Sequence, residues 1–346
     1  MRFFFRLLIL LALLSVAALL AWHGLGREMD RGAPTAVPVR VQVTPGERLR
    51  SILADLEHNG ALHDARLAEL YLRLAGHVPR VQAGTYEIAP HASARAVLEQ
   101  LAAGRVVLEQ LTVIEGWSFA QMRQALDAHP AVLHELAGRP EREVMAALGA
   151  PEQPAEGRFF PDTYRFAAGT SDRRILELAY QRMRHELDLA WSSRAQDLPL
   201  TGPDQALILA SIVEKETGRE DERAKVAAVF VNRLRLGMRL QSDPTVIYGL
   251  GANYDGDIHA RDLVTDTPFN TYTRAGLPPT PIALPGAASL QAATHPAPID
   301  AVYFVATGNG DGTHRFSATL AEHDVALRAY LRKLGVQLGG TGIHPR

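Results

Sequence analysis

An uncharged apolar run near the N-terminus is the feature that most constrains this chain. Residues Leu7 to Trp22 (LLILLALLSVAALLAW) carry no charged side chain, and Arg2 and Arg6 precede this run. With its apolar neighbours, the stretch is long enough for a tilted membrane span of about 20 residues. Cationic residues before a span place the N-terminus in the cytoplasm. Residues 1–26 are therefore predicted to be a cytoplasmic N-terminus and a transmembrane anchor, with the rest of the chain exported.

A cleavable signal peptide is the alternative for the same segment. Val16 and Ala18 fit the small-residue positions that precede a cleavage site. We favour the retained anchor, and both interpretations send the remaining chain out of the cytoplasm.

Composition excludes several classes of function for the exported part. Its length of about 320 residues exceeds one ordinary core, so two or three domains are expected. The net charge is −2 and no basic stripe is present, which argues against nucleic acid as a partner. The absence of cysteine excludes thiol chemistry, Cys-ligated zinc and disulfides. No histidine has a metal-ligand spacing, so neither a metal nor a cofactor is expected.

Residues 27–105 are predicted to form a linker and a small module. The linker covers residues 27–36, has little apolar periodicity and contains Gly32 and Pro34. In the module, residues 37–105, a strand with alternating valines is followed by helices near residues 49–56 and 65–74, a strand at 84–88 and a helix at 93–101. The order and size of these elements resemble LysM-type glycan-binding modules. A structural spacer without a ligand is the alternative.

The remaining chain is predicted to contain a linking region and a catalytic domain. Residues 106–200 are expected to be a mainly helical linking subdomain, and residues 201–335 an α+β catalytic domain that begins with two helices. Residues 336–346 are expected to be a disordered tail. The fold class is therefore α+β, with an N-terminal transmembrane helix.

Several familiar catalytic arrangements fail on spacing. His134-Glu135 and His185-Glu186 lack the second histidine of a zinc-protease motif, and residues 116–120 lack the last glycine of a nucleophile elbow. Ser211 and Lys215 are four residues apart, whereas serine acyl-enzymes of the penicillin-binding type place the lysine three residues after the serine.

Helical periodicity then separates two glutamates that lie close together in sequence. Residues 209, 212, 213 and 216 fall on one helical stripe, so Glu216 continues an apolar face toward the domain interior. Glu214 lies about 200° away at ~100° per residue. Loss of hydration disfavours a charged carboxyl and raises its pKa toward the range of a general acid. Glu216 is the better candidate; an exposed helix end, or an ion pair with Arg219 or Arg223, is the alternative.

Two polar segments follow these helices. Asp243 precedes Pro244 and is predicted to cap a short helix, with ligand binding as the alternative role. Asn270 and Tyr272 lie in a loop that offers amide and phenol groups beside apolar residues, a mixture found both in sugar sites and in many surface loops.

At this point the sequence resembles the endolytic murein transglycosylases (MltG or YceG-like proteins). The resemblance runs from the anchor to about Tyr330. The motifs that carry it are Glu156-Gly157, FPDTY at 160–164, ASIVEKET at 210–217, VNRL at 231–234, LQSDPTVIYG at 240–249, NTY at 270–272, GLPP at 276–279 and ATHP at 293–296. Thr280, Leu284 and Phe269 depart from the family's usual residues, which leaves loop details and subsite preference open.

The resemblance implies an activity and a set of site residues. It implies non-hydrolytic cleavage of the β-1,4 bond between N-acetylmuramic acid and N-acetylglucosamine within peptidoglycan glycan strands, leaving 1,6-anhydromuramic ends and terminating nascent strands. Glu216 falls on the family's catalytic position. The motifs give the candidate substrate-binding residues Asn232, Gln241, Asp243, Tyr248, Asn270 and Tyr272.

The resemblance also implies a location and partners. The chain would be a single-pass protein of the bacterial inner (cytoplasmic) membrane, with its catalytic part in the periplasm and peptidoglycan synthases (penicillin-binding proteins) as partners. Two alternatives stay open. One is a hydrolase of the same bond, and the other is a non-catalytic, membrane-anchored scaffold that binds glycan.

Overall fold

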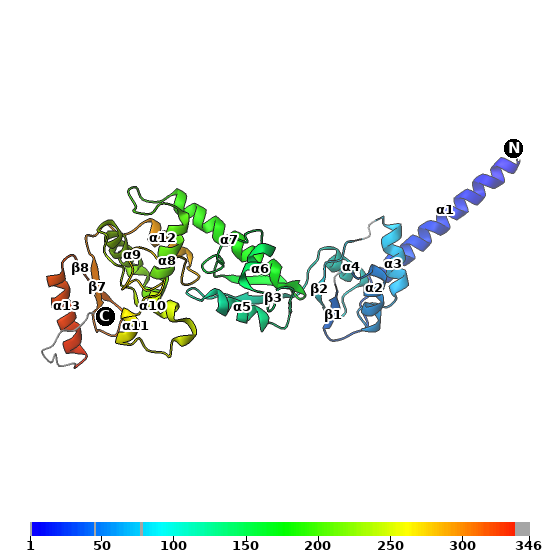
Figure 1. Cartoon of the computed structure of the whole chain (residues 1–346). Helices are drawn as coiled ribbons and strands as arrows, with labels where there is room; N and C mark the ends of the chain where they lie inside the picture. The colour runs from blue at the N-terminus through cyan, green and yellow to red at the C-terminus, as the bar shows by residue number, and fades with distance from the viewer. Residues whose placement is uncertain (1, 45, 77–78, 336–346) are drawn as a thin grey trace. The chain divides into compact units, whose positions relative to one another are not determined.

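The computed structural model describes residues 2–44, 46–76 and 79–335 (Figure 1). The chain forms two compact units. The first comprises Met1–Gln110, Pro130–Leu133 and Arg165–Ser171, and the second comprises Leu111–His129, His134–Tyr164 and Asp172–Arg346. Most of the expected linking region thus belongs to the same unit as the expected catalytic domain. The tail that we expected at residues 336–346 lies outside the described residues.

Helix α1 (Arg2–Met29) is the one helix in the described chain that is long and apolar enough to cross a membrane, judged by length and composition. Its apolar side chains from Phe3 to Trp22 are largely exposed. The helix does not stop at residue 26 but continues to Met29, which is buried in the first unit. The following residues pack as well, since Ala33 is buried and its N–H donates to the Ala92 carbonyl. Part of the predicted linker, residues 27–36, therefore packs against the small module.

Most of the rest of the first unit is a small α+β module that follows the predicted order of elements. Its strands and helices are β1 (Val39–Val43), α2 (Leu49–His58), α3 (Ala65–Leu74), β2 (Gly84–Ile88) and α4 (Ala94–Ala102). Strands β1 and β2 pair antiparallel, with Val41 opposite Tyr86. Asp64 caps α3 and Ser93 caps α4 through their side chains. The apolar faces of both strands and of α2, α3 and α4 meet in one core.

The segment between this module and the candidate catalytic region mixes short strands with helices. Its elements are β3 (Leu108–Thr112), α5 (Phe119–Asp127), β4 (Val132–Leu133), α6 (Glu141–Ala147), β5 (Thr163–Ala167), β6 (Thr170–Ser171) and α7 (Asp172–Ser192). Strand β3 pairs with β5, and β4 pairs with β6 in parallel. A capping box between Ser118 and Gln121 fixes the start of α5.

The second unit is built around α8, which packs against α9 and α12. Its later elements are α8 (Pro203–Glu216), α9 (Glu220–Arg235), α10 (Asp243–Leu250), the 3-10 helix η1 (Gly251–Asn253), α11 (Ala260–Val264), α12 (Ala287–Thr294), β7 (Tyr303–Ala306), β8 (His314–Ser317) and α13 (Leu320–Lys333). Strands β7 and β8 form an antiparallel hairpin, and α13 packs against it. The mixed α+β class is as predicted.

Candidate active site

Helix α8 carries Glu216 as its last residue. Gly202 is the N-cap and Pro203 the first helical residue. All residues from Ala206 to Val213 are buried, so the helix runs through the core rather than along its surface. Ser211, four residues before Lys215, donates its hydroxyl to the Ile208 carbonyl and is not available as a nucleophile. The rigid, buried helix therefore holds the carboxyl of Glu216 in a fixed place.

The carboxyl of Glu216 lines a cavity of about 130 Å³. The other residues that line this cavity are Arg233, Leu240, Gln241, Asp243, Tyr272, Tyr303, Phe304 and His323. The Ser242 hydroxyl donates a hydrogen bond of 2.5 Å to Glu216 Oε1. Among the described residues no arginine forms an ion pair with Glu216: Arg219 pairs with Asp221 at 2.9 Å, and Arg223 lies 4.0 Å from Glu214. The ion-pair alternative for Glu216 is thus not observed.

The pKa of Glu216 is raised to about 7, mainly by burial and also by the negative charge of the neighbouring Asp243. The hydrogen bond from Ser242 and the positive charge of Arg233 oppose this rise. A carboxyl with this pKa is substantially protonated near neutral pH and can both give and accept a proton. This electrostatic setting is the one predicted from the helical stripe.

Glu214 has a different environment, two residues earlier on the helix. Its Oε2 accepts the backbone N–H of Gly286 at 2.9 Å, and its Oε1 lies 4.0 Å from a guanidinium nitrogen of Arg223. Gly286 is the N-cap of α12. Glu214 therefore joins two helices and does not line the cavity, which agrees with the separation of the two acids by helix face.

Asp243 and Tyr272 form a second polar pair in the cavity. The Tyr272 hydroxyl donates to Asp243 Oδ1 at 2.6 Å. Burial raises the pKa of Tyr272, and the negative charge of Asp243 raises it further, so the phenol keeps its proton. The predicted cap is wrong: Ser242 is the N-cap of α10, and Asp243 is the first helical residue. Because Ser242 turns its hydroxyl to Glu216 instead, α10 has no side-chain cap.

Arg233 supplies the positive charge of the cavity and organises one wall. Its side chain is buried and donates to the backbone carbonyls of Val302 and Leu240, at 2.7 and 2.6 Å. Its guanidinium also lies over the Tyr303 ring, 5.4 Å from the ring centre. The residue thus ties α9 to β7 and to the chain that enters the site, and it remains a cation beside Glu216.

Gln241 also contacts the guanidinium of Arg233. Its Oε1 accepts from Arg233 at 3.5 Å, and its backbone has φ +50°. Left-handed backbone is uncommon outside glycine and often marks a functional position. The amide is exposed, so it can also reach a ligand.

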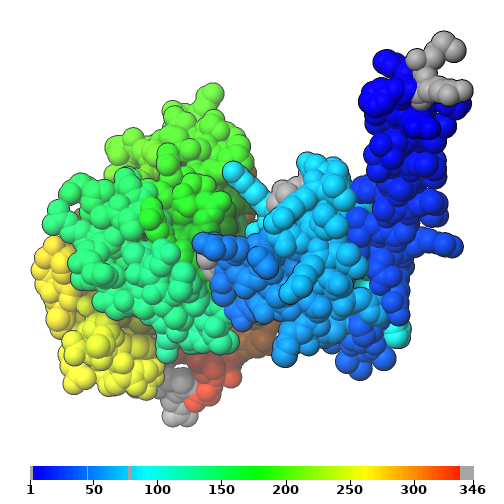
Figure 2. Space-filling model, turned by 90° about the vertical axis from the view of Figure 1, so that its right-hand side faces the viewer, coloured from blue at the N-terminus to red at the C-terminus, as the bar shows by residue number. Residues whose placement is uncertain are grey.

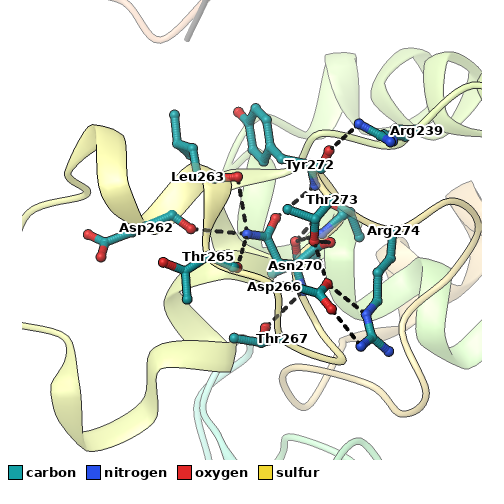
Figure 3. A network of polar contacts seen from close by, with 12 residues as sticks. Arg239, Asp262, Leu263, Thr265, Asp266, Thr267, Asn270, Tyr272, Thr273 and Arg274 are labelled. Carbon is teal, nitrogen blue, oxygen red and sulfur yellow. Dashed lines mark hydrogen bonds and ion pairs between the residues drawn. The ribbon is translucent and has the colours of Figure 1, made fainter.

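The amide of Asn270 positions the loop that carries Tyr272 (Figure 3). Its Nδ2 donates to the carbonyls of Asp262, Leu263 and Thr265, and its Oδ1 accepts the backbone N–H of Tyr272. Nearby, Asp266 and Arg274 make two hydrogen bonds of 2.9 Å across the same loop. Asn270 is fully buried. It therefore acts on the site through Tyr272 and does not face the cavity.

Two further predicted residues also lie outside the cavity lining. Asn232 donates its amide to the carbonyls of Ile299 and Ala301, at 2.8 and 3.0 Å. Tyr248 donates its hydroxyl to Glu156 at 3.2 Å and packs edge-on against Phe269. Of the six predicted substrate-binding residues, the structure brings Gln241, Asp243 and Tyr272 together with Glu216.

Glu156 is a buried acid behind the site. Its carboxylate accepts from the Phe119 N–H and the Tyr248 hydroxyl. Burial raises the pKa of Glu156 to about 7, against these hydrogen bonds. The next residue, Gly157, has φ +79°, and a Cβ there would clash with the side chain of Pro281, so only glycine fits. This explains why an acid and a glycine occur together at this point of the chain.

Several residues of the site were not predicted from the sequence: Ser242, which donates to Glu216, and the cavity-lining Arg233, Leu240, Tyr303, Phe304 and His323. Ser242 and Arg233 lie inside motifs that we quoted, but their side chains had no assigned role. Tyr303 and His323 stack with their ring centres 5.0 Å apart, and each is about 90–110 residues from Glu216 in sequence. Only the tertiary fold brings them to the cavity.

One group of side chains has the spacing of a cation site. Asp127, His134 and Asp172 place potential ligand atoms within 4.8 Å of one another. However, the Asp172 carboxylate already accepts the backbone N–H groups of Glu135, Leu136 and Arg173. Its role in holding the start of α7 explains its burial without a metal.

Comparison with known proteins gives one consistent result. The family model described as "YceG-like family" matches residues 41–329. An endolytic murein transglycosylase of Bacillus subtilis is 29% identical over 311 residues, which cover 85% of each chain. A protein of the same name from Streptococcus pneumoniae is 25% identical; the alignment covers 93% of this chain but only 64% of that longer protein.

A solved structure shows the same fold. The crystal structure of a YceG-like protein from Listeria monocytogenes is similar with a TM-score of 0.52 and 28% identity, covering 84% of this chain and 99% of that one. The family model spans most of the chain, including every residue that lines the cavity. This chain belongs to the YceG-like family.

Proposed function

We propose that this protein is an endolytic lytic transglycosylase of peptidoglycan, a lyase in which Glu216 is the single catalytic acid and base. The observation that carries the proposal is a carboxyl with a pKa raised to about 7 at the wall of a polar cavity. The names of the two bacterial relatives support the substrate and the reaction class.

The proposed reaction breaks the β-1,4 bond between N-acetylmuramic acid and N-acetylglucosamine. Glu216 gives its proton to the bridging oxygen, which leaves as the O4 hydroxyl of N-acetylglucosamine. The C6 hydroxyl oxygen of the muramic residue then bonds to C1, and Glu216 takes the proton that this hydroxyl loses. The product is a 1,6-anhydro ring, no water is consumed, and Glu216 returns to its protonated form.

The other cavity residues have supporting roles in this proposal. The carboxylate of Asp243, held by Tyr272 at 2.6 Å, places negative charge in the cavity where positive charge develops at the anomeric carbon. Ser242 orients the carboxyl of Glu216 at 2.5 Å. Gln241 offers an amide to the substrate's polar groups. Asn232, Tyr248 and Asn270 would contribute by positioning these residues.

Two glutamine variants test the proposal with purified sacculi. Glu216→Gln removes the proton donor at nearly constant size and should lower cleavage by about 10²- to 10⁴-fold, the usual contribution of general acid catalysis. Glu214→Gln is the matched control on the same helix and should lose much less. Both variants should keep the far-UV circular dichroism of the wild type. Equal losses from the two variants would contradict the role of Glu216.

A hydrolase of the same bond is the second candidate, because the cavity contains a second carboxyl. Asp243 lines the same cavity as Glu216, and hydrolytic glycosidases usually use a pair of carboxylates for catalysis. A non-catalytic scaffold is the remaining alternative. A Glu216→Gln protein that still performs the cellular role of the wild type would favour the scaffold.

We further propose that α1 is retained as a single-pass anchor in the inner membrane, with the N-terminus in the cytoplasm and the cavity in the periplasm. The apolar surface of α1 and the basic residues at its start support this topology. A mature protein that begins near Leu19, measured by intact-mass spectrometry, would instead show cleavage after Ala18.

Two finer assignments complete the proposal. In the small module, helices α2 and α3 connect the antiparallel strands β1 and β2. This module would bind glycan as LysM-type modules do. The enzyme would terminate nascent strands beside peptidoglycan synthases. Binding of purified glycan strands to the full-length Glu216→Gln protein, measured with and without mutations in the module, tests the first assignment.

A further inference from the structure

Helix α3 has two apolar faces, and the core of the module uses only one of them. Ala65, Ala68 and Leu72 point into the core and are buried. Leu70 and Leu74, on another side of the helix, remain 46% and 60% exposed. A surface helix of a soluble protein usually has a single apolar stripe. The second stripe of α3 therefore requires a different explanation.

The second stripe lies against the end of α1. Together the two helices enclose an apolar groove of about 680 Å³. On the α1 side the groove is lined by Ala18, Ala21, Trp22, Gly24, Leu25 and Glu28, and on the α3 side by Leu67, Leu70 and Leu74. In Figure 2, the end of the blue column of α1 lies against the module, while the rest of the column stands free.

An aromatic contact fixes the two helices to each other. The rings of Trp22 and Tyr71 stack with centres 5.7 Å apart and planes 15° apart. Arg95 lies over the Tyr71 ring at 5.3 Å, donates to its hydroxyl and pairs with Asp30 at 2.7 Å. These contacts therefore fix the position of α3 along the axis of α1.

The length of α1 relates this position to a bilayer. A hydrocarbon core of about 30 Å is spanned by about 20 helical residues at 1.5 Å each. Counted from Phe3 the span ends at Trp22, and counted from Arg6 it ends at Leu25. Tryptophan is enriched at the boundary between lipid and water. In both cases the outer boundary falls at the residues that line the groove.

From this geometry we propose that α3 lies on the outer surface of the membrane, with Leu70 and Leu74 inserted among the lipid chains of the outer leaflet. The occupant is lipid because the groove is continuous with the lipid-facing surface of α1 and lies at the same height as its outer end. The first unit then contacts the bilayer surface directly and is not joined to it through a flexible linker. The inference rests on the membrane anchoring proposed above.

Single cysteines provide the test, because the natural chain has none. The full-length variants Leu70→Cys and Leu74→Cys carry an environment-sensitive fluorophore in phosphatidylcholine vesicles that contain nitroxide-labelled lipids. Leu13→Cys, in the middle of α1, is the control for insertion. Gln42→Cys is the exposed control on β1, which lies well away from α1 in Figure 1.

At positions 70 and 74, nitroxides near the headgroup should quench the label several-fold more strongly than at position 42, and the emission should shift to shorter wavelength. At position 13, nitroxides deep in the acyl chains should quench best. If the label at position 13 is quenched but those at 70 and 74 are not, the proposed insertion of α3 into the outer leaflet is refuted, whereas membrane anchoring by α1 is still supported.

Two other outcomes would also overturn the inference. An unquenched label at position 13 would show that α1 does not insert, which refutes the anchoring itself. Labels at 70 and 74 that report an apolar setting without lipid quenching, and lose it when the protein is diluted with lipid, would show that a second copy of the chain covers the face.

Discussion

Replacing Ser242 with alanine should move the pH dependence of the enzyme in a defined direction. The Ser242 hydroxyl donates to Glu216 over 2.5 Å, and this hydrogen bond lowers the pKa of the carboxyl against the effect of burial. A hydrogen bond to a charged group contributes about 1.5 kcal/mol at the low end of its range, and 1.36 kcal/mol corresponds to one pKa unit. Loss of the donor should therefore raise the pKa of Glu216 from about 7 to about 8.

The assay is the rate of release of soluble fragments from purified sacculi as a function of pH. A general acid must hold its proton before the bond breaks, so the alkaline limb of the profile reports the pKa of Glu216. In Ser242→Ala this limb should move to higher pH. Ser193→Ala, which removes a hydroxyl bonded to the end of α7, is the matched control and should leave the limb in place. A limb that stays or moves to lower pH in Ser242→Ala would refute the reasoning.

Three further predictions follow from the same site. Glu216→Gln should have a free energy of unfolding about 1–3 kcal/mol above that of the wild type when measured by urea unfolding above pH 7. The folded state raises the pKa of the Glu216 carboxyl from 4.5 to about 7, so the wild-type protein loses stability as the pH rises through that window. Below pH 4.5 the difference between the two proteins should vanish. Tyr272→Phe should lower kcat about tenfold while changing KM little, because it frees Asp243 without removing its charge; an unchanged kcat would contradict this. Incubation with EDTA should leave the cleavage rate unchanged, because the proposed mechanism uses only protein side chains; loss of activity that zinc restores would show that the single-carboxyl mechanism is wrong.

Local periodicity predicted the main features around Glu216. The apolar stripe of α8 is a repeat within one helix, so the inward position of Glu216 and the different face of Glu214 could be inferred without tertiary information. The strands and helices of the small module followed from alternation and helical spacing for the same reason. These features depend on contacts between residues that are near in sequence.

Polar side chains were harder to assign because their partners lie far away in sequence. Asn232 and Asn270 resemble ligand-binding amides in the sequence, yet backbone carbonyls use their donors, including carbonyls more than 60 residues from Asn232. Asp243 resembles a helix cap, but the tyrosine 29 residues later captures its carboxylate. The packing of the predicted linker at 27–36 could not be foreseen, because its partner around Ala92 is equally remote in sequence.

The mass of the glycan ends tests the central claim most directly. The full-length protein in vesicles is incubated with purified sacculi, and the released fragments are analysed by mass spectrometry. If the C6 hydroxyl of the muramic residue attacks C1 while Glu216 moves the protons, the new muramic ends are one water lighter than reducing ends and resist borohydride reduction. Reducing ends formed at the same bond would show that water is the attacking group and that the protein is a hydrolase.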